Sequence, residues 1–358
     1  MNRTDTQKTR EALLGHYHAY PGLQIQDIFK FLFHSAMGCE HLVTDERAAL
    51  AYIQKEFATL PPDLPMQAEP LDGDYSRVPL ALLRAGLSAQ TLARLFCLSA
   101  KAEPEGKALL QQKLQVALEL TAQGLLPFDS KELAEQIAAW AKPGYPAIHH
   151  SEQFRAQYHP SYRVIANRYA AILPLLTEID KQLSRGHVTL AIEGGSASGK
   201  STLAELLQEI YPCTVFHMDD FFLQPEQRTA QRLAEVGGNV DRERVLAEVL
   251  TPLAAREPIT YRPYDCSSQT LGSPITVAPS PLTVIEGVYA MHPLLRPHYT
   301  LSVFLDVDAD TQRARILQRN SPAMAKRYFE QWIVLENAYF SQMHVPQSCT
   351  LKLQAERL

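Results

Sequence analysis

The chain contains 358 residues, carries a formal net charge of -5, and is 46% hydrophobic and 20% charged. This composition excludes a mostly disordered chain, and the length predicts two domains. Because the sequence has no strongly basic stretch and no apolar run of the roughly 18–20 residues that span a membrane, we expect neither a nucleic-acid partner nor a membrane partner.

Residues 1–185 carry apolar side chains at three- and four-residue spacing, which is typical of helices. The clearest helical segments are 49–60, 82–100, 106–126 and 130–141. Proline and glycine clusters separate them, so the sequence predicts an all-α domain of unknown role. The helix expected over 80–100 offers a face for a homo-oligomer, and packing inside the domain explains the same pattern.

This first half also holds most of the histidines: His16, His18, His34, His41, His149, His150 and His159. Their spacing matches no established metal motif. We favour the interpretation that they cap helices and satisfy buried polar groups. A metal site assembled from distant segments, or a second ligand site that uses Arg163, stays open as an alternative.

A long helix is expected from Ser161 to Leu183, and the pattern changes after Gly186. Short apolar and β-branched runs follow at 187–193, 213–218, 282–285, 301–307 and 350–353. Helical stretches lie between them at 201–210, 241–255, 310–318 and 326–340. This alternation predicts an α/β domain over 186–358, with a parallel sheet flanked by helices.

A glycine-rich loop of the form G-x-x-x-x-G-K-[ST] directly follows the first of these strands. It consists of Gly194, Gly195, Ser196, Ala197, Ser198, Gly199, Lys200 and Ser201, and Thr202 follows it. Glycines let successive N–H groups point inward and cradle an anion, and the following helix adds its positive dipole end. Lys200 is expected to reach the β- and γ-phosphates of a nucleotide, and Ser201 to offer its hydroxyl to Mg²⁺.

Two carboxylate sites fall at the ends of later strands, where an open α/β sheet binds its ligands. Asp219 and Asp220 follow the second strand, and Glu286 ends the third. A carboxylate close to a γ-phosphate can orient an acceptor hydroxyl and take its proton. The alternatives are an aspartate pair that caps a turn and a glutamate at the surface end of a strand.

Five cations follow the fourth strand: Arg313, Arg315, Arg319, Lys326 and Arg327. Arginines can neutralise the charge that spreads over a moving phosphoryl group, and we assign that role to Arg319 and Arg327. Arg313 and Arg315 share a predicted helix with Asp308 and Asp310, so a solvated helix face explains them as well.

Taken together, residues 187–353 resemble the uridine kinase and phosphoribulokinase group of P-loop kinases, which includes nicotinamide riboside kinases. The matching pieces run in the family's order: AIEGGSASGKST, HMDDFF, TYRPYDC, TVIEGVYA and SVFLDVDADTQRARILQRN. The resemblance implies a P-loop kinase fold, ATP and Mg²⁺ as cofactors, and a small-molecule phosphoryl acceptor. Residues before 187 have no recognised counterpart in that group.

Position by position, the resemblance implies that residues 194–202 bind ATP phosphates, that Asp219 is the general base and that Glu286 supports Mg²⁺. It makes Arg319 and Arg327 lid residues, and it places Asp220, Tyr264, Asp265 and Gln269 beside the acceptor. Two segments depart from the family pattern. Gln269 stands where uridine kinases carry a histidine, and residues 323–327 lack the arginine–glycine–arginine run.

We therefore expect an ATP-dependent kinase that phosphorylates a hydroxyl of a nucleoside- or sugar-like metabolite. A nucleotide-dependent switch that controls the helical domain is the alternative, and an N-terminal domain with its own reaction is a third hypothesis. The polar start of the chain and five scattered cysteines, none in a CxxC pair, favour a cytoplasmic protein.

Overall fold

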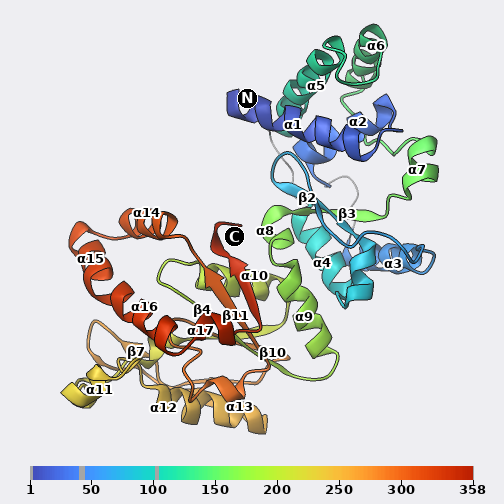
Figure 1. The fold of residues 1–358 in the computed structure, drawn as a ribbon. Coiled ribbons are helices and arrows are strands. Elements are labelled where there is room, and N and C mark those ends of the chain that lie inside the picture. Colours follow the sequence, from blue (N-terminus) through green and yellow to red (C-terminus); the bar gives the residue numbers. More distant parts are fainter. Residues whose placement is uncertain (1–2, 40–44, 101–104, 358) are drawn as a thin grey trace. The chain divides into compact units, whose positions relative to one another are not determined.

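The computed structural model describes residues 3–39, 45–100 and 105–357, which divide into two compact units, Met1–Leu173 and Pro174–Leu358 (Figure 1). Each unit has a hydrophobic core of its own. The helix α9 (Leu173–Leu183) falls almost entirely in the second unit, where Asp180 accepts a hydrogen bond of 2.9 Å from the Tyr211 hydroxyl. The second unit thus begins before residue 186.

The first unit is helix-rich, as predicted. Its helices are α1 (Arg3–Ala19), α2 (Ile25–Met37), α3 (Glu46–Phe57), α4 (Ala89–Ser99), α5 (Gly106–Ala122), α6 (Ser130–Ala141), α7 (Glu152–Tyr158) and α8 (Asn167–Ala170). The stretch 82–100 is not one helix, because the 3₁₀ turn Leu80–Ala85 ends at Gly86, whose φ of 109° stops it before α4. The proposed oligomer face over 80–100 is therefore divided between two elements.

A small antiparallel sheet in this unit was not predicted, so the unit is not purely helical. Its strands are β1 (Glu69–Pro70), β2 (Tyr75–Pro79) and β3 (Tyr162–Ala166), in the order β1-β2-β3. The long helix predicted from Ser161 to Leu183 is wrong, because this segment forms β3, α8 and α9 in turn. The β-branched and aromatic residues of YRVIA favour a strand, and Pro174 can sit only in the first turn of a helix.

The second unit is built on a five-stranded parallel sheet in the order β12-β11-β4-β10-β5. Its strands are β4 (Val188–Gly194), β5 (Cys213–His217), β10 (Leu282–Glu286), β11 (Leu301–Asp306) and β12 (Leu351–Gln354). All five predicted strands are confirmed. β4 is buried along its whole length, as expected of a strand that has neighbours on both sides and helices against the sheet.

Helices connect these strands. They are α10 (Lys200–Ile210), α11 (Ala230–Ala234), α12 (Arg242–Arg244), α13 (Thr251–Ala255), α14 (Ala309–Arg319), α15 (Pro322–Arg327), α16 (Ile333–Gln342) and α17 (Val345–Ser348). α10 packs against β4, β5 and β10. Two short hairpins, β6 (Ile259–Tyr261) with β9 (Ile275–Val277) and β7 (Tyr264–Asp265) with β8 (Thr270–Leu271), lie between β5 and β10 in the chain. In Figure 1, α14, α15 and α16 follow one another in an arc beside the sheet.

Within the residues that the structure describes, no helix combines the length and the apolar character needed to cross a membrane.

Candidate active site

The glycine-rich loop joins the end of β4 to the start of α10, in the middle of the sheet. Gly194 has a φ of 153°, and a Cβ atom there would lie 2.7 Å from the carbonyl oxygen of Leu305. Gly199, at the N-cap of α10, has a left-handed φ of 94°, which L side chains rarely adopt. The loop therefore requires glycine at both positions, and it ends at the positive end of a helix dipole.

The two side chains at the start of α10 that were predicted to bind phosphate and Mg²⁺ already contact oxygen atoms. The Lys200 ammonium donates to the carbonyl oxygens of Gly194 and Gly195, at 3.0 Å each. The Ser201 hydroxyl donates to Glu286 Oε1 at 3.0 Å. Thr202 follows in the first turn of α10 and is exposed. Ser198 is buried, and its hydroxyl has no hydrogen-bond partner among the described residues.

Glu286 lies at the carboxyl end of β10, beside His217 at the end of the neighbouring β5. His217 Nδ1 and Glu286 Oε1 are 2.6 Å apart. Burial alone would raise the pKa of Glu286, but the hydrogen bond from His217 and the positive charge of Lys200 outweigh it and lower that pKa. The same hydrogen bond raises the pKa of His217. Glu286 is therefore a buried carboxylate that stays ionised.

Asp219 and Asp220 lie on a 3₁₀ turn, Met218–Phe221, directly after β5. Asp219 is exposed, yet the protein around its carboxylate removes enough water to raise its pKa, and the positive charge of Lys200 opposes that rise. Desolvation also raises the pKa of Asp220, whose carboxylate is hydrogen-bonded to Tyr261. The two aspartates therefore have different partners, and Asp219 is the one whose charge interacts with Lys200.

Apart from Asp220, the residues predicted to face the acceptor belong to the β7–β8 hairpin. Tyr264 is buried, and its hydroxyl accepts a hydrogen bond from Arg228. Asp265 accepts hydrogen bonds from Ser267 and Ser268, which lower its pKa to about 2. Gln269 is exposed with a φ of 58° in the turn of the hairpin. Asp265 is therefore engaged with its own loop.

The predicted lid cations lie on two successive helices. Arg319 is exposed at the last residue of α14. Arg327 is exposed at the end of α15, where its guanidinium lies 5.0 Å from the centre of the Trp332 ring. Arg315, by contrast, donates to the carbonyl oxygen of Ala197 at 3.2 Å, so it contacts the glycine-rich loop directly. Arg313 stacks on the ring of Phe329 at 4.7 Å.

Two residues that contact the loop were not predicted as site residues. Glu336, buried on α16, accepts from both the backbone N–H and the hydroxyl of Ser196. Gln312 on α14 donates to the carbonyl oxygen of Ser196 at 2.8 Å. No local pattern marks Glu336 or Gln312, because their roles arise from the way α14 and α16 pack beside the loop.

Glu193, the residue before the loop, is fully buried at the end of β4. Its carboxyl accepts from the N–H groups of Gly194 and Met291 and from the Tyr339 hydroxyl. Burial raises the pKa of Glu193 to about 7. An acidic residue inside an apolar strand was the signal that could have identified it, since a buried carboxyl needs specific partners.

The histidines of the first unit occupy separate environments. His16 lies 3.2 Å from Glu69, and His150 lies 2.8 Å from Asp27. His34 is buried on α2, His159 caps α7, and His18 and His149 are exposed. His41 lies outside the described residues. Among the residues that are described, no group of three or more histidine, cysteine or acidic side chains could hold a metal ion.

Arg163, the residue considered for a second site, is buried and paired elsewhere. Its guanidinium contacts Glu56 Oε2 at 2.9 Å and lies over the rings of Tyr52 and Phe96. It therefore links β3 to α3 and α4.

Known proteins that are similar to this chain match the second unit. Residues 189–341 match the model of the phosphoribulokinase / uridine kinase family. A uridine kinase of Chloroflexus aurantiacus is 27% identical over 142 residues, which are 37% of this chain and 68% of that protein. Uridine kinase-like protein 3 of Arabidopsis thaliana is 25% identical over 37% of this chain and 30% of its own length.

Among solved structures, a possible uridine kinase from Bacillus stearothermophilus aligns with 50% of this chain and 99% of its own, at 21% identity and a TM-score of 0.37. The resemblance seen in the sequence motifs is confirmed by the family match over residues 189–341. The matched segment starts after the first unit ends.

Proposed function

We propose that this protein is an ATP-dependent kinase that transfers the γ-phosphoryl group to a hydroxyl of a small nucleoside- or sugar-like metabolite. One observation carries the proposal. A glycine-rich loop, an ammonium group and a buried ionised carboxylate meet at the carboxyl ends of adjacent parallel strands, where open α/β sheets bind their ligands. The family match over residues 189–341 supports the same class of reaction.

The loop and Lys200 bind the triphosphate in this proposal. The N–H groups of residues 194–202 and the N-terminus of α10 hold the phosphate oxygens. Lys200 exchanges its two carbonyl partners for the β- and γ-phosphates, which are stronger acceptors because they are charged. Ser198 brings a buried hydroxyl without a partner among the described residues, which a phosphate oxygen would satisfy.

Ser201 and Glu286 fit a magnesium ion, because a hydroxyl and an ionised carboxylate are the hard oxygen ligands that Mg²⁺ prefers. When bound there, Mg²⁺ neutralises charge on the phosphates. His217 holds the Glu286 carboxylate in place from the neighbouring strand. The hydrogen bond from His217 therefore both favours the ionised form of Glu286 and fixes the orientation of its carboxylate.

Asp219 is the general base in this proposal. The acceptor hydroxyl gives its proton to the Asp219 carboxylate as its oxygen bonds to the γ-phosphorus, and the bond from that phosphorus to the bridging oxygen breaks to release ADP. A raised pKa suits this role, since it makes the carboxylate a stronger base. Asp220, Tyr264, Asp265 and Gln269 contact the acceptor from the adjoining turn and hairpin.

Arg319 and Arg327 neutralise the transferring group from the α14–α15 segment, which closes over the site and excludes water. Both guanidinium groups are exposed, so they are available to move toward the phosphates. We place the enzyme in the cytoplasm, where ATP and small metabolites are plentiful. The alternative of a nucleotide switch depended on one continuous helix from residue 161 to the first strand, and that helix is interrupted.

The test is a metabolite screen that measures ADP production by the full chain with ATP and Mg²⁺. One nucleoside- or sugar-like compound should raise ADP production well above the rate with ATP alone. The Lys200→Ala variant, with unchanged circular dichroism and unfolding temperature, should lose that increase. Equal rates for the two proteins with every compound would refute the kinase assignment.

A further inference from the structure

The first unit contains a half-open cavity of about 160 Å³ whose lining residues all belong to Met1–Leu173. This volume is similar to that of a cavity of ~150 Å³ that binds one benzene molecule. The wall combines aromatic and charged side chains. Its main members are Tyr20, Glu69, Arg77, Phe154, Tyr158 and Tyr162. The proposed kinase site uses none of them.

One side of the cavity is a charge pair. Arg77 is only 2% exposed, and its Nη1 lies 3.5 Å from Glu69 Oε2. Its guanidinium stacks over the rings of Tyr162 and Phe31. Arg77 Nε and Nη2 have no hydrogen-bond partner among the described residues. A buried donor without an acceptor is costly. Both nitrogens are covered by protein atoms, so the guanidinium must turn before it can donate to a molecule in the cavity.

Glu69 supplies a hydrogen-bond acceptor to the cavity wall. Its carboxylate accepts from His16 Nδ1 at 3.2 Å, and its side chain is 33% exposed. The hydrogen bond from His16 and the charge of Arg77 outweigh burial and hold the pKa of Glu69 below its ordinary value. The cavity therefore presents an ionised acceptor beside a cationic donor, and the two charges cancel.

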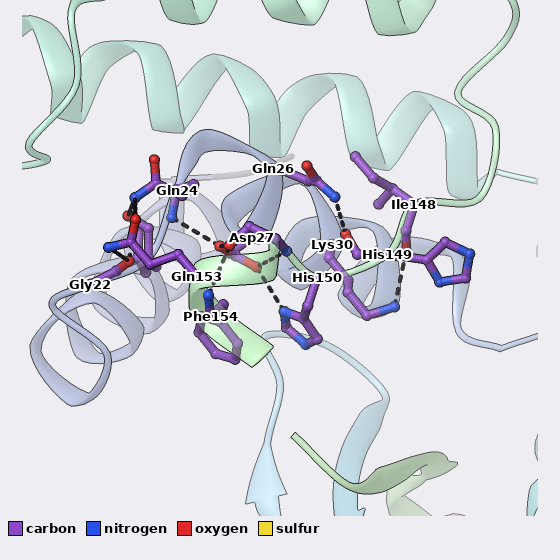
Figure 2. Close-up of polar contacts among 12 residues, drawn as sticks. Gly22, Gln24, Gln26, Asp27, Lys30, Ile148, His149, His150, Gln153 and Phe154 are labelled. Carbon is purple, nitrogen blue, oxygen red and sulfur yellow. Dashed lines mark hydrogen bonds and ion pairs between the residues drawn. The ribbon is translucent and has the colours of Figure 1, made fainter. Parts of the chain in front are cut away.

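Tyr162 is held by a second set of contacts. Its hydroxyl lies 2.6 Å from His150 Nε2, and His150 Nδ1 lies 2.8 Å from Asp27 Oδ1. Figure 2 shows Asp27 on α2 with the His150 ring and the backbone N–H of Gln24 directed toward its carboxylate. Asp27 also accepts from the N–H and the hydroxyl of Ser151, so its charge is well satisfied.

The contacts of His150 with Asp27 and Tyr162 determine which ring nitrogen carries the proton. Burial lowers the pKa of His150 to about 4, so the ring is neutral at pH 7. With Asp27 ionised, the ring proton lies on Nδ1, and Nε2 accepts from the Tyr162 hydroxyl. The Tyr162 oxygen is then left with its lone pairs, so it is a further acceptor in the wall.

The same segment is clamped to α2 at two more points. Lys30 donates to the carbonyl oxygen of Ile148 at 3.0 Å, and Gln26 donates to that of His149 at 2.7 Å (Figure 2). The segment that carries His150 is thus held in place by hydrogen bonds, and His150 in turn contacts the wall residue Tyr162. A preformed wall costs little ordering entropy when a ligand binds.

We propose that the cavity of the first unit binds an uncharged, planar, ring-sized molecule with adjacent hydrogen-bond donor and acceptor groups, as in an aromatic amide. The ring packs against the partly exposed Tyr20 and Tyr158, whose own rings contact each other and the buried Phe154. The amide carbonyl accepts from Arg77, and the amide N–H donates to Glu69. An anion would meet the Glu69 carboxylate and a cation the Arg77 guanidinium, so the charge pair selects a neutral ligand.

Four ring-sized probes compare a neutral amide with an anion, a cation and an apolar ring: benzamide, benzoate, benzamidine and toluene. They are to be titrated into the full chain, with binding followed by ligand-detected and protein-detected NMR. Benzamide should bind with a Kd of about 1 mM, within the range expected for so few atoms. Benzoate, benzamidine and toluene should each bind at least about tenfold more weakly, which corresponds to about 1.4 kcal/mol.

Glu69→Gln is the decisive variant, because it keeps the shape of the wall and removes its negative charge. It should reverse the preference, so that benzoate gains and benzamide loses affinity. Tyr162→Phe should weaken benzamide severalfold without changing the order of the probes. Tyr145→Phe is the matched control, since Tyr145 lies outside the cavity wall and packs on Trp140. It should leave every affinity unchanged.

The proposal is overturned if benzamide fails to bind at about 10 mM, roughly ten times the expected Kd, or binds no better than toluene. It is also overturned if Glu69→Gln folds and leaves the order of the probes unchanged. If that variant does not fold, the comparison of the four probes on the wild-type chain and on Tyr162→Phe still decides. Lys200→Ala should bind benzamide normally, so this result is independent of the kinase assignment.

Discussion

Individual carboxyl groups around the glycine-rich loop differ mainly in how they are solvated and paired. Glu286 is held ionised by His217 and Lys200, whereas burial favours the protonated form of Glu193. The protonation behaviour of Asp219 is intermediate, since desolvation raises its pKa and the charge of Lys200 opposes the rise. Three carboxyl groups of one site can thus serve as ligand, structural support and base.

For Asp219, we predict that Asp219→Asn lowers kcat by about 10²- to 10⁴-fold, the usual contribution of a general base. The affinity for ATP should be retained, because the amide keeps the shape of the side chain. Asp220→Asn is the neighbouring control and should lose much less kcat. In the wild-type enzyme kcat should rise with pH as Asp219 loses its proton, and that rise should be absent in Asp219→Asn. Steady-state assays over a series of pH values measure the loss of kcat and its pH dependence.

For Glu193, we predict a pH-dependent contribution to stability. Its pKa is raised from 4.5 to about 7, so the folded chain holds the proton more tightly than the unfolded chain. Unfolding then becomes easier as the pH rises from 4.5 to 7, and this group alone removes about 3 kcal/mol of unfolding free energy across that window. Urea unfolding at several pH values measures the slope.

Glu193→Gln should flatten this slope, since an amide does not titrate. Exposed Glu205 on α10 provides the control substitution Glu205→Gln, which should leave the slope as in the wild type. Parallel slopes for the wild type and Glu193→Gln would show that the carboxyl is not protonated in the folded chain.

At the scale of elements, the regular parts of the second unit were predictable and the long-range contacts were not. Buried strands such as β4 and β10 show in the sequence as short apolar runs, and the loop shows as a motif. The strand β3 was missed because its residues also fit a helical spacing when the proline at 174 is ignored. Glu336 was missed because its contact with Ser196 joins residues 140 positions apart.

Glu336 on α16 gives a prediction at this scale. Its carboxyl occupies the Ser196 N–H. Burial raises the pKa of Glu336, and in its ionised form the group adds a negative charge beside the loop that we propose binds a triphosphate. Glu336→Gln should therefore tighten ATP binding about tenfold, because a neutral hydrogen bond is weaker than a charge-assisted one by about 1.4 kcal/mol. Glu330→Gln, on the exposed turn before α16, is the matched control. Calorimetric titration gives both dissociation constants, and unchanged or weaker binding in Glu336→Gln would contradict the prediction.

At the scale of the whole molecule, the chain consists of two units with separate cores. The family match explains only the second. The sequence predicted the existence of the first unit and its helices, but not the cavity. That cavity is lined by segments around residues 20, 69, 77 and 160, which no local pattern relates to one another.

Two cores predict two unfolding transitions in a calorimetric scan. ATP with Mg²⁺ at about 100 times its Kd should stabilise one transition by about 2.7 kcal/mol and leave the other in place. In Lys200→Ala both transitions should stay where they are in the absence of ATP. A single transition that moves as a whole with ATP would show that the units unfold together.

The order of the parallel sheet has a consequence for synthesis of the chain. β4 pairs with β10 and β11, which begin roughly 90 and 110 residues later in the sequence. At a translation rate of 5–20 residues per second, β4 leaves the ribosome about 5 to 20 s before either neighbour exists. This mostly apolar strand has no partner during that interval, so the nascent chain is a natural client for a chaperone that shields a single strand.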